Sequence, residues 1–256
     1  MSSFITEYKN LIIKGINNQI TPKQLGLSLY NQELQRKAKL NLPTRIDEII
    51  LTIKAIFELQ NNKEFNFIET IEQGKTLFVG EGNFSFSLVI AENVKNQYNI
   101  VATTIENQDE ISDFTAENIT QLNKIGATVL YKIDATKLEN YFRSNSFENI
   151  IFQFPNAGSR EPINGRNPNF VLLNNFLKSA KLVLSQNGKA IISVVDSHYY
   201  EGIFQIEETF KNSGFSNIKC YDFNILHFEN YTHQMTNRNE SAIDKNDKLV
   251  TIVFEK

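Results

Sequence analysis

A glycine-rich turn separates an apolar run from a helical pattern in the sequence LFVGEGNFSFS, residues 77–87. The apolar lead predicts a buried strand, and the residues after Asn83 have helical spacing. Glycine permits a sharp turn and a close approach of a ligand, and the free N–H groups at the start of a helix point toward that ligand. We therefore expect a nucleotide-like ligand at this turn. The candidate binding residues are Gly80, Glu81, Gly82, Asn83 and Phe84.

Three kinds of ligand compete for the turn. A phosphate-binding P-loop would have Lys followed by Ser or Thr after the last glycine, where this chain has Asn83 and Phe84. A dinucleotide loop has a third glycine, where this chain has Ser85. S-adenosylmethionine has no pyrophosphate and needs only the close backbone approach, and Glu81 could bind its ammonium group. A purely structural strand–helix turn is the alternative.

Two carboxylates stand where the next two strands should end. Glu106 follows the apolar run VATTI, and Asp134 lies in YKIDATKL. Ligands of parallel sheets bind at the carboxyl ends of the strands. Glu106 could accept hydrogen bonds from both ribose hydroxyls of the cofactor, and Asp134 could accept one from its adenine amino group. Each side chain could instead cap the following helix.

A proline and a short amide follow the fourth expected strand, in FQFPNAG, residues 152–158. In many amino-group methyltransferases such residues line the pocket beside the methyl donor, where the amide orients a planar nitrogen. We therefore expect Phe154 and Pro155 at the cofactor and Asn156 at the acceptor. A plain turn is the alternative, because Pro-Asn and Ala-Gly are turn formers.

Strands and helices alternate in the part of the chain that carries these motifs. The expected strands are 75–79, 99–105, 127–133, 149–154 and 189–195. The expected helices are 84–95, 109–123, 137–144, 169–186 and 202–213. This alternation predicts a doubly wound, mostly parallel α/β sheet.

The end of the chain departs from this alternation. FSNIKCYDFNILHF and DKLVTIVFEK read as two strands with no helix between them, joined by a long polar loop over residues 229–246. We expect them to pair antiparallel at one edge of the sheet. Five strand–helix units followed by an antiparallel pair match the Rossmann-like plan of class I methyltransferases better than a dinucleotide fold.

Residues 1–60 have a different pattern, with three expected helices and no convincing strand. They carry eight Lys/Arg and five Asp/Glu, whereas the rest of the chain carries 18 basic and 24 acidic residues. The apolar stripe within residues 46–57 must be buried against something. We therefore expect a helical cap at 1–60, a connector at 61–74 and a methyltransferase domain at 75–256. The cap would serve substrate binding or self-association.

Composition sets the outer limits. Hydrophobic residues at 41% and charged residues at 21% are ordinary for a globular protein. The start MSSFITEYKN is charged early, so we expect no secretory signal, and we expect no membrane span. Cys220 is the single cysteine, expected to be a small packed residue, and an intracellular, cytoplasmic location is predicted. The three histidines lack metal-ligand spacing, so we expect no metal.

The motifs together resemble a known family. LFVGEGNFSFSLVIA, ATTIEN, YKIDATKL, FQFPNAG and FENYTHQMT, in this order, are similar to the ribosomal RNA uridine-N3 methyltransferase-like domain of fungi and other eukaryotes, over residues 75–256. The resemblance implies a methyltransferase that uses S-adenosylmethionine, with large-subunit ribosomal RNA as substrate of the characterised members. Carried over, the glycine motif, the ribose-binding acid and the adenine-side acid fall on Gly80, Glu81, Gly82, Phe84, Glu106 and Asp134.

The chain departs from the family pattern in two places. The strand-four motif commonly reads Asn-Phe-Pro-His, and here residues 153–156 read Gln-Phe-Pro-Asn. The late motif commonly reads Tyr-x-His-Arg-Arg-Thr. Tyr231 and His233 match it, but Gln234 and Met235 replace the two arginines. Because guanidinium groups pair with phosphate, this loss bears on the RNA substrate more than on the cofactor.

Methyl transfer to a uracil N3 requires positioning and the loss of a proton, for which a base or a polarising contact is needed. The candidate catalytic residues are Asn156, Asp196, His198 and His233, and the candidate substrate contacts are Tyr231 and His233. RNA is the leading expected partner. The alternatives are a methyltransferase of a small molecule or peptide, and a non-catalytic module that binds S-adenosylmethionine.

Overall fold

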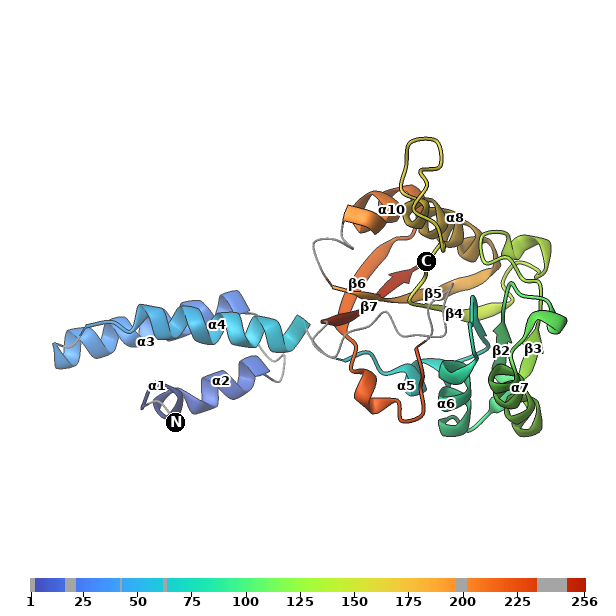
Figure 1. Ribbon diagram of the computed structural model, residues 1–256. Helices are drawn as coiled ribbons and strands as arrows, with labels where there is room; N and C mark the ends of the chain where they lie inside the picture. The colour runs from blue at the N-terminus through green and yellow to red at the C-terminus, as the bar shows by residue number, and fades with distance from the viewer. Residues whose placement is uncertain (1–2, 17–21, 42, 62–63, 197–201, 234–247) are drawn as a thin grey trace. The chain divides into compact units, whose positions relative to one another are not determined.

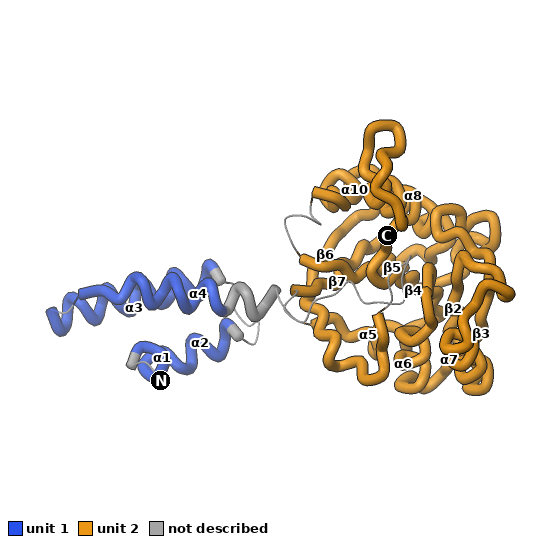
Figure 2. Tube along the Cα trace, in the orientation of Figure 1, with its two compact units in different colours: residues 1–63 blue, residues 64–256 orange. Residues whose placement is uncertain are grey.

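The computed structural model of the chain describes residues 3–16, 22–41, 43–61, 64–196, 202–233 and 248–256. The chain divides into two compact units, residues 1–63 and 64–256, coloured separately in Figure 2. Each unit has an apolar core of its own: one cluster of buried side chains lies in the first unit and two lie in the second.

A seven-stranded sheet is the frame of the described part of residues 64–256 (Figure 1). The strands are β1 (Thr76–Phe78), β2 (Ile100–Thr103), β3 (Thr128–Leu130), β4 (Phe147–Gln153), β5 (Leu184–Val195), β6 (Asn217–Asp222) and β7 (Leu249–Glu255). Their order is β3-β2-β1-β4-β5-β7-β6, with β7 antiparallel to both β5 and β6 and the other pairs parallel. This is the order of class I methyltransferases, so the predicted α/β fold is confirmed.

Helices cover both faces of the sheet (Figure 1). They are α5 (Phe67–Ile71), α6 (Ser85–Asn93), α7 (Asp113–Ile125), α8 (Pro168–Val183) and α10 (Ile206–Ser213). Helix α8 buries Leu173, Phe176 and Leu177 on one face of the sheet. Helices α5 and α6 bury Phe67 and Ile90 on the other face. Burial of such aromatic and aliphatic side chains is the main term that holds helices on a sheet.

Local sequence signals set the ends of two of these helices. The Ser112 side chain accepts a hydrogen bond from the Thr115 N–H at the start of α7, and Gly126, at a φ of 103°, ends that helix. At the start of α8, Asn167 caps the helix and Pro168 takes the first position. These are the signals on which helix prediction from sequence depends.

Short 3-10 turns account for two differences from the expected elements. They are η1 (Gln97–Asn99), η2 (Gln108–Glu110), η3 (Leu138–Asn140) and η4 (Ile225–His227). The helix expected at 137–144 is only η3, because the Asp134 side chain holds the preceding chain in a tight turn through Thr136. The helix expected to begin at 109 is η2 followed by α7, which starts at Asp113. The expectation of a packed Cys220 is wrong, since this cysteine is exposed on the edge strand β6.

The order of the strands decides where a ligand can bind. The chain runs outward from β1 through β2 to β3, then returns to place β4 on the other side of β1. The connections that follow β1 and β4 therefore leave the sheet in opposite directions, and a crevice opens between them. In α/β sheets this switch point is the usual ligand site.

Four helices make up the described part of the first unit. They are α1 (Ser3–Glu7), α2 (Lys9–Ile16), α3 (Pro22–Leu40) and α4 (Ile46–Asn61). The stretch FITEYKNLIIKGI, residues 4–16, has helical spacing throughout, but the structure divides it between α1 and α2 at Tyr8. In α4, Ile49 is buried while Ile46 and Ile50 are exposed, and the side chains at positions 56 and 57 lie outside the described residues. Within the described ranges, no helix is both long and apolar enough to cross a membrane.

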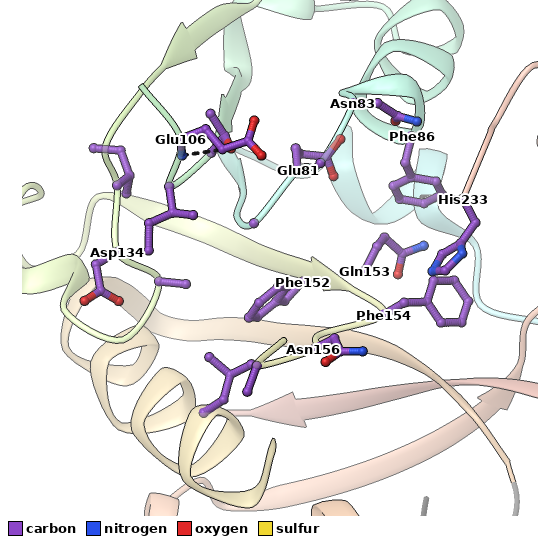
Figure 3. A pocket seen from close by; sticks show the side chains of 18 of the residues that line it. Glu81, Asn83, Phe86, Glu106, Asp134, Phe152, Gln153, Phe154, Asn156 and His233 are labelled. Carbon is purple, nitrogen blue, oxygen red and sulfur yellow. Dashed lines mark hydrogen bonds between the residues drawn. The ribbon is translucent and has the colours of Figure 1, made fainter. Parts of the chain in front are cut away.

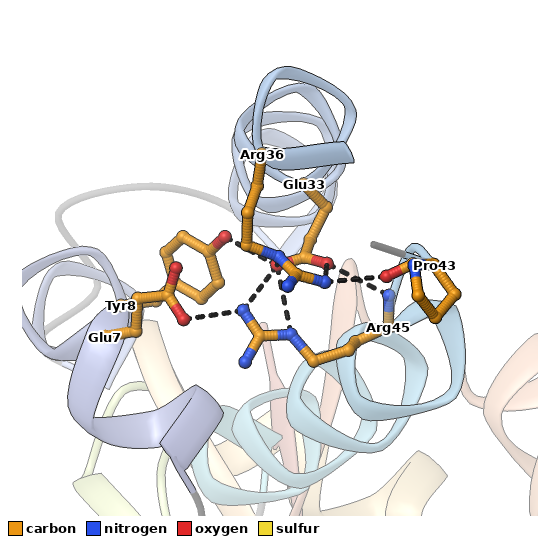
Figure 4. Close-up of polar contacts among 6 residues, drawn as sticks. All are labelled: Glu7, Tyr8, Glu33, Arg36, Pro43 and Arg45. Atoms are coloured by element: carbon orange, nitrogen blue, oxygen red, sulfur yellow. Dashed lines mark hydrogen bonds and ion pairs between the residues drawn. The ribbon is translucent and has the colours of Figure 1, made fainter. Parts of the chain in front are cut away.

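A buried carboxylate ties these helices together (Figure 4). Glu33 of α3 has no exposed surface, and it accepts hydrogen bonds from the Tyr8 hydroxyl at 2.6 Å and from the guanidinium groups of Arg36 and Arg45. Burial by itself raises the pKa of Glu33, but these hydrogen bonds outweigh burial and hold the pKa well below its usual range. The network joins α1–α2, α3 and the start of α4.

Candidate active site

A cavity of about 300 Å³ lies at the carboxyl ends of β1, β2 and β4. Loops that follow four strands line it, together with residues 231–233. Figure 3 shows Glu106 and Asp134 toward one end of the cavity and Gln153, Phe154 and His233 gathered at the other. Ten of the predicted site residues line it: Gly80, Glu81, Gly82, Asn83, Glu106, Asp134, Phe154, Asn156, Tyr231 and His233.

The glycine turn follows β1 directly and is held against β2, because the Glu81 N–H donates to the Thr103 carbonyl at 3.0 Å. Gly80 has a φ of 64°, and a Cβ there would lie 2.4 Å from the Phe152 ring. Both facts require glycine at this position. A Cβ on Gly82 would meet nothing within 4 Å, so the space beside this residue is open to a ligand.

Glu81 is a buried carboxylate at the wall of the cavity. It is 5% exposed and accepts a hydrogen bond from the Ser87 N–H at 3.2 Å. In the described residues no Lys or Arg pairs with it. Burial raises the pKa of Glu81 to about 7, against the opposing effect of the Ser87 hydrogen bonds. A buried carboxylate without a counter-ion is a suitable partner for a ligand cation.

Glu106 and Asp134 lie beyond the ends of β2 and β3. Burial, aided by the charge of Glu110, raises the pKa of Glu106. Asp134 Oδ1 accepts from the Thr136 N–H at 2.9 Å and from its hydroxyl at 2.6 Å, so it stabilises the turn as well as lining the cavity. Burial raises the pKa of Asp134, but the Thr136 hydrogen bonds and the Lys137 charge bring it below its usual value.

The end of β4 forms the opposite wall. Phe154 has a φ of 46°, an uncommon conformation for a side chain of this size, and such strain gathers at functional sites. Its ring meets the His233 ring edge-on at a centroid distance of 5.1 Å. Asn156 is exposed, and its side-chain oxygen accepts from the Gly158 N–H at 2.9 Å.

Gln153, the last residue of β4, was not among the predicted site residues. Both polar atoms of its amide are buried, and neither has a hydrogen-bond partner in the described residues. A buried amide that lacks partners is uncommon, because it gives up its hydrogen bonds to water without replacement. The signal in the sequence was its place in the strand-four motif, where Gln153 stands at the position of the family's asparagine, but a strand residue at that place is usually a core residue.

His233 and Tyr231 come from the far end of the sequence to close the cavity. Burial lowers the pKa of His233 to about 4, so the ring is uncharged at neutral pH. The Tyr231 ring contacts the Phe86 ring at 5.2 Å, and burial, together with the charge of Glu81, raises the Tyr231 pKa far above its usual value. Both residues line the cavity next to the end of β4.

Four predicted site residues are not among those that line the cavity. Phe84 is fully buried in the core below the turn, and Pro155 is buried behind the end of β4. Asp196 is half exposed and pairs with Lys248 at 2.7 Å. His198 lies outside the described residues. The roles predicted for these four residues stay predictions.

The strand order, the glycine turn after β1 and the acids after β2 and β3 define a class I S-adenosylmethionine-dependent methyltransferase. The family described as rRNA (uridine-N3-)-methyltransferase, BMT5-like, matches residues 77–235. The match spans more than half of the chain, and the chain belongs to this family.

Two relatives illustrate the similarity. An uncharacterized protein of Arabidopsis thaliana is 30% identical over 167 residues, which cover 61% of this chain and 79% of that protein. The human ferredoxin-fold anticodon-binding domain-containing protein 1 is 30% identical over 124 residues, which cover 47% of this chain but only 19% of that protein. A S-adenosylmethionine-dependent methyltransferase of known structure from Archaeoglobus fulgidus aligns with a TM-score of 0.45 at 12% identity, over 74% of this chain and 90% of that one.

The residues of the cavity fit S-adenosylmethionine, the cofactor of the class. Glu81 offers a buried anionic partner to an ammonium group, and Gly82 leaves room for close approach. Glu106 can accept hydrogen bonds from a ribose at the other end of the cavity. When bound, the cofactor supplies an electrophilic methyl group on a sulfonium. In the described residues, no group of three His, Cys, Asp or Glu side chains could hold a metal ion.

Proposed function

We propose that this enzyme methylates N3 of a uracil base in RNA, with ribosomal RNA as the substrate class that its family suggests. The observation that supports this most is the Gln153 amide, which is buried at the cavity wall and has no hydrogen-bond partner among the residues that the structure describes. A ligand that pairs with this amide would relieve its cost. In uracil, N3 stands between two carbonyl groups, and either oxygen can accept from the Gln153 N–H.

Methyl transfer to uracil N3 is favoured by a hydrogen-bond donor such as the Gln153 amide. N3 attacks once its proton leaves, and the negative charge spreads onto the two flanking carbonyl oxygens. A hydrogen bond from Gln153 to one of these oxygens stabilises that charge. His233, which is uncharged, lines the same end of the cavity and can contact the same base. Because its pKa is low, the His233 ring is a weak base. We therefore assign it a hydrogen-bonding role, and the N3 proton of uracil passes to solvent.

Labelled methyl transfer to total RNA tests the proposal, with N3-methyluridine identified by mass spectrometry after digestion to nucleosides. Gln153→Ala should lower kcat by about 10²–10³-fold, the usual cost of losing one donor to a developing oxyanion. Its affinity for S-adenosylhomocysteine should be unchanged. Gln121→Ala, at an exposed position of α7, is the matched control. A wild-type rate in Gln153→Ala, or a label on another nucleoside, would contradict the proposal.

Charge favours a small-molecule acceptor as the second candidate. Residues 61–256 carry 24 acidic and 18 basic residues, and phosphate contacts normally supply much of the affinity for RNA. If RNA is the substrate, turnover should fall steeply as salt rises. Turnover that ignores salt, with the label in a metabolite extract and not in RNA, would favour the small molecule.

The boundaries of the functional parts are also a proposal: a cap at 1–60, a connector at 61–74 and a catalytic domain at 75–256. The net positive charge of the cap supports a role in holding the RNA backbone. Self-association through the cap is the alternative. A cytoplasmic location stays a prediction.

A further inference from the structure

Two hydrogen bonds and one close polar contact fasten the segment that carries His233 to the glycine turn. The Asn83 side-chain N–H donates to the Thr232 carbonyl at 2.8 Å. The Thr232 N–H donates to the Ser85 hydroxyl at 3.1 Å, and that hydroxyl lies 3.1 Å from the Thr232 carbonyl. These contacts join residues 147 and 149 positions apart. Asn83, Ser85 and Thr232 are called the latch below.

Two of the three latch residues are buried and held by further hydrogen bonds, whereas Thr232 is exposed. Asn83 is 6% exposed and Ser85 is 2% exposed. The Asn83 carbonyl accepts from the Asn118 side chain of α7 at 2.8 Å, and the Asn83 side-chain oxygen accepts from the Ser85 N–H at 3.0 Å. Asn83 is therefore fixed by α7 and by the turn itself, and Thr232 is held in place by Asn83 and Ser85. Such part-buried hydrogen bonds favour one arrangement, because the buried groups of Asn83 and Ser85 would lose partners if the contact broke.

The latch gives Asn83 a different role from the cofactor binding that the sequence predicts. The sequence places Asn83 beside the cofactor, yet its amide nitrogen is bonded to Thr232 and its amide oxygen to Ser85. These bonds use the side chain within the protein. The Asn83 side chain is thus directed toward the end of the cavity formed by Gln153, Phe154 and His233, called the acceptor end below. There His233 follows Thr232 directly, and its ring contacts the Phe154 ring.

We propose that Asn83 and Ser85 are positioning residues that hold His233 at the acceptor end of the cavity. The inference rests on the proposed function only for the identity of the acceptor. Without the latch, Tyr231 would keep its ring contact with Phe86 and its N–H bond to the Phe228 carbonyl, but Thr232 would lose its hydrogen bonds to the glycine turn. His233 would then leave its buried place beside Phe154.

His233 itself provides a readout that needs neither cofactor nor RNA. The chain has three histidines, so their ring signals can be followed by NMR during a pH titration and assigned with His233→Asn. In the wild type, burial holds the His233 pKa near 4, against an ordinary value of 6.5. In Ser85→Ala, the His233 pKa should rise toward 6.5, and amide exchange over residues 228–233 should speed up about tenfold, because the Thr232 N–H loses its hydrogen bond.

A matched control separates positioning from general damage. Ser179→Ala removes another buried hydroxyl that accepts from a backbone N–H, that of Leu138 at 2.6 Å, and donates to a side chain. It should leave the His233 titration unchanged. Ser85→Ala should bind S-adenosylhomocysteine within about twofold of the wild type. If Ser85→Ala does not fold, Asn83→Ser carries the test, because it can still cap the Ser85 N–H but cannot reach Thr232. A His233 that titrates as in the wild type in the folded variant would overturn the proposal.

Discussion

Glu81 shows how one side chain can make a binding site depend on pH. Burial raises its pKa to about 7, so in the free protein it is about half protonated at neutral pH. A raised pKa means that the ionised form is less stable in the folded chain. Its contribution to the free energy of unfolding is therefore full below the unfolded value of 4.5 and declines as pH rises toward 7. A bound ammonium group would reverse this by favouring the ionised form.

Cofactor affinity should follow the ionisation of Glu81. Affinity for S-adenosylhomocysteine, measured by calorimetry, should fall as pH drops below about 7, by at most about tenfold per pH unit. Glu81→Gln should bind more weakly at pH 8 and show little dependence on pH between 6 and 8. Equal affinities of the wild type across this range would place the ammonium group elsewhere.

At the scale of the element, the turn between β1 and α6 contains two glycines with different structural roles. Gly80 is required by the fold, because its φ is positive and a Cβ would meet the Phe152 ring. Gly82 has free space where its Cβ would be. In the same turn, Gly80 is therefore needed for the fold, whereas Gly82 leaves open space beside the cavity.

This difference can be measured with a pair of variants. Gly80→Ala should destabilise the protein by at least about 1 kcal/mol, since alanine is strained at this φ and the ring must move. Gly82→Ala should leave the melting temperature close to that of the wild type and yet weaken binding of S-adenosylhomocysteine. If Gly82→Ala binds the cofactor as the wild type does, the cofactor does not approach the turn at Gly82.

At the scale of the whole molecule, the described lining of the cavity comes entirely from residues 64–256, while the Glu33 network lies entirely in residues 1–63. The two units can therefore be perturbed one at a time. The lowered pKa of Glu33 means that its stabilising effect is full above the ordinary value of 4.5 and is lost as pH falls below it. The first unit should accordingly be sensitive to acid.

Glu33→Ala should unfold or loosen the first unit alone. It leaves two guanidinium groups and the Tyr8 hydroxyl without their buried acceptor, a loss of about 3–5 kcal/mol. Amide exchange over residues 3–61 should rise strongly, while affinity for S-adenosylhomocysteine changes less than about twofold. Asp47→Ala, which removes an exposed acid of the same unit, should do neither. A large loss of cofactor affinity in Glu33→Ala would show that the two units depend on each other.

Sequence alone predicted the alternation of strands and helices, the glycine turn and the two acids that follow β2 and β3, Glu106 and Asp134. These features depend on local rules: the spacing of apolar residues, the conformational needs of glycine and the ends of strands in a parallel sheet. It failed over 137–144, where the apolar spacing favoured a helix and the Asp134–Thr136 hydrogen bonds fixed a turn.

Only the tertiary structure decided which side chains meet. Gln153 reads as an ordinary strand residue until the packing of β4 leaves its amide without a partner. Ser85 and Thr232 are 147 positions apart, and Asp196 finds Lys248 only because β7 pairs beside β5. Such contacts depend on strand register and on how loops fold back over the sheet, which no local pattern of residues specifies. The sequence by itself determined the class of enzyme, the glycine turn and the two acids, and the tertiary structure decided which side chains gather around Gln153 and His233.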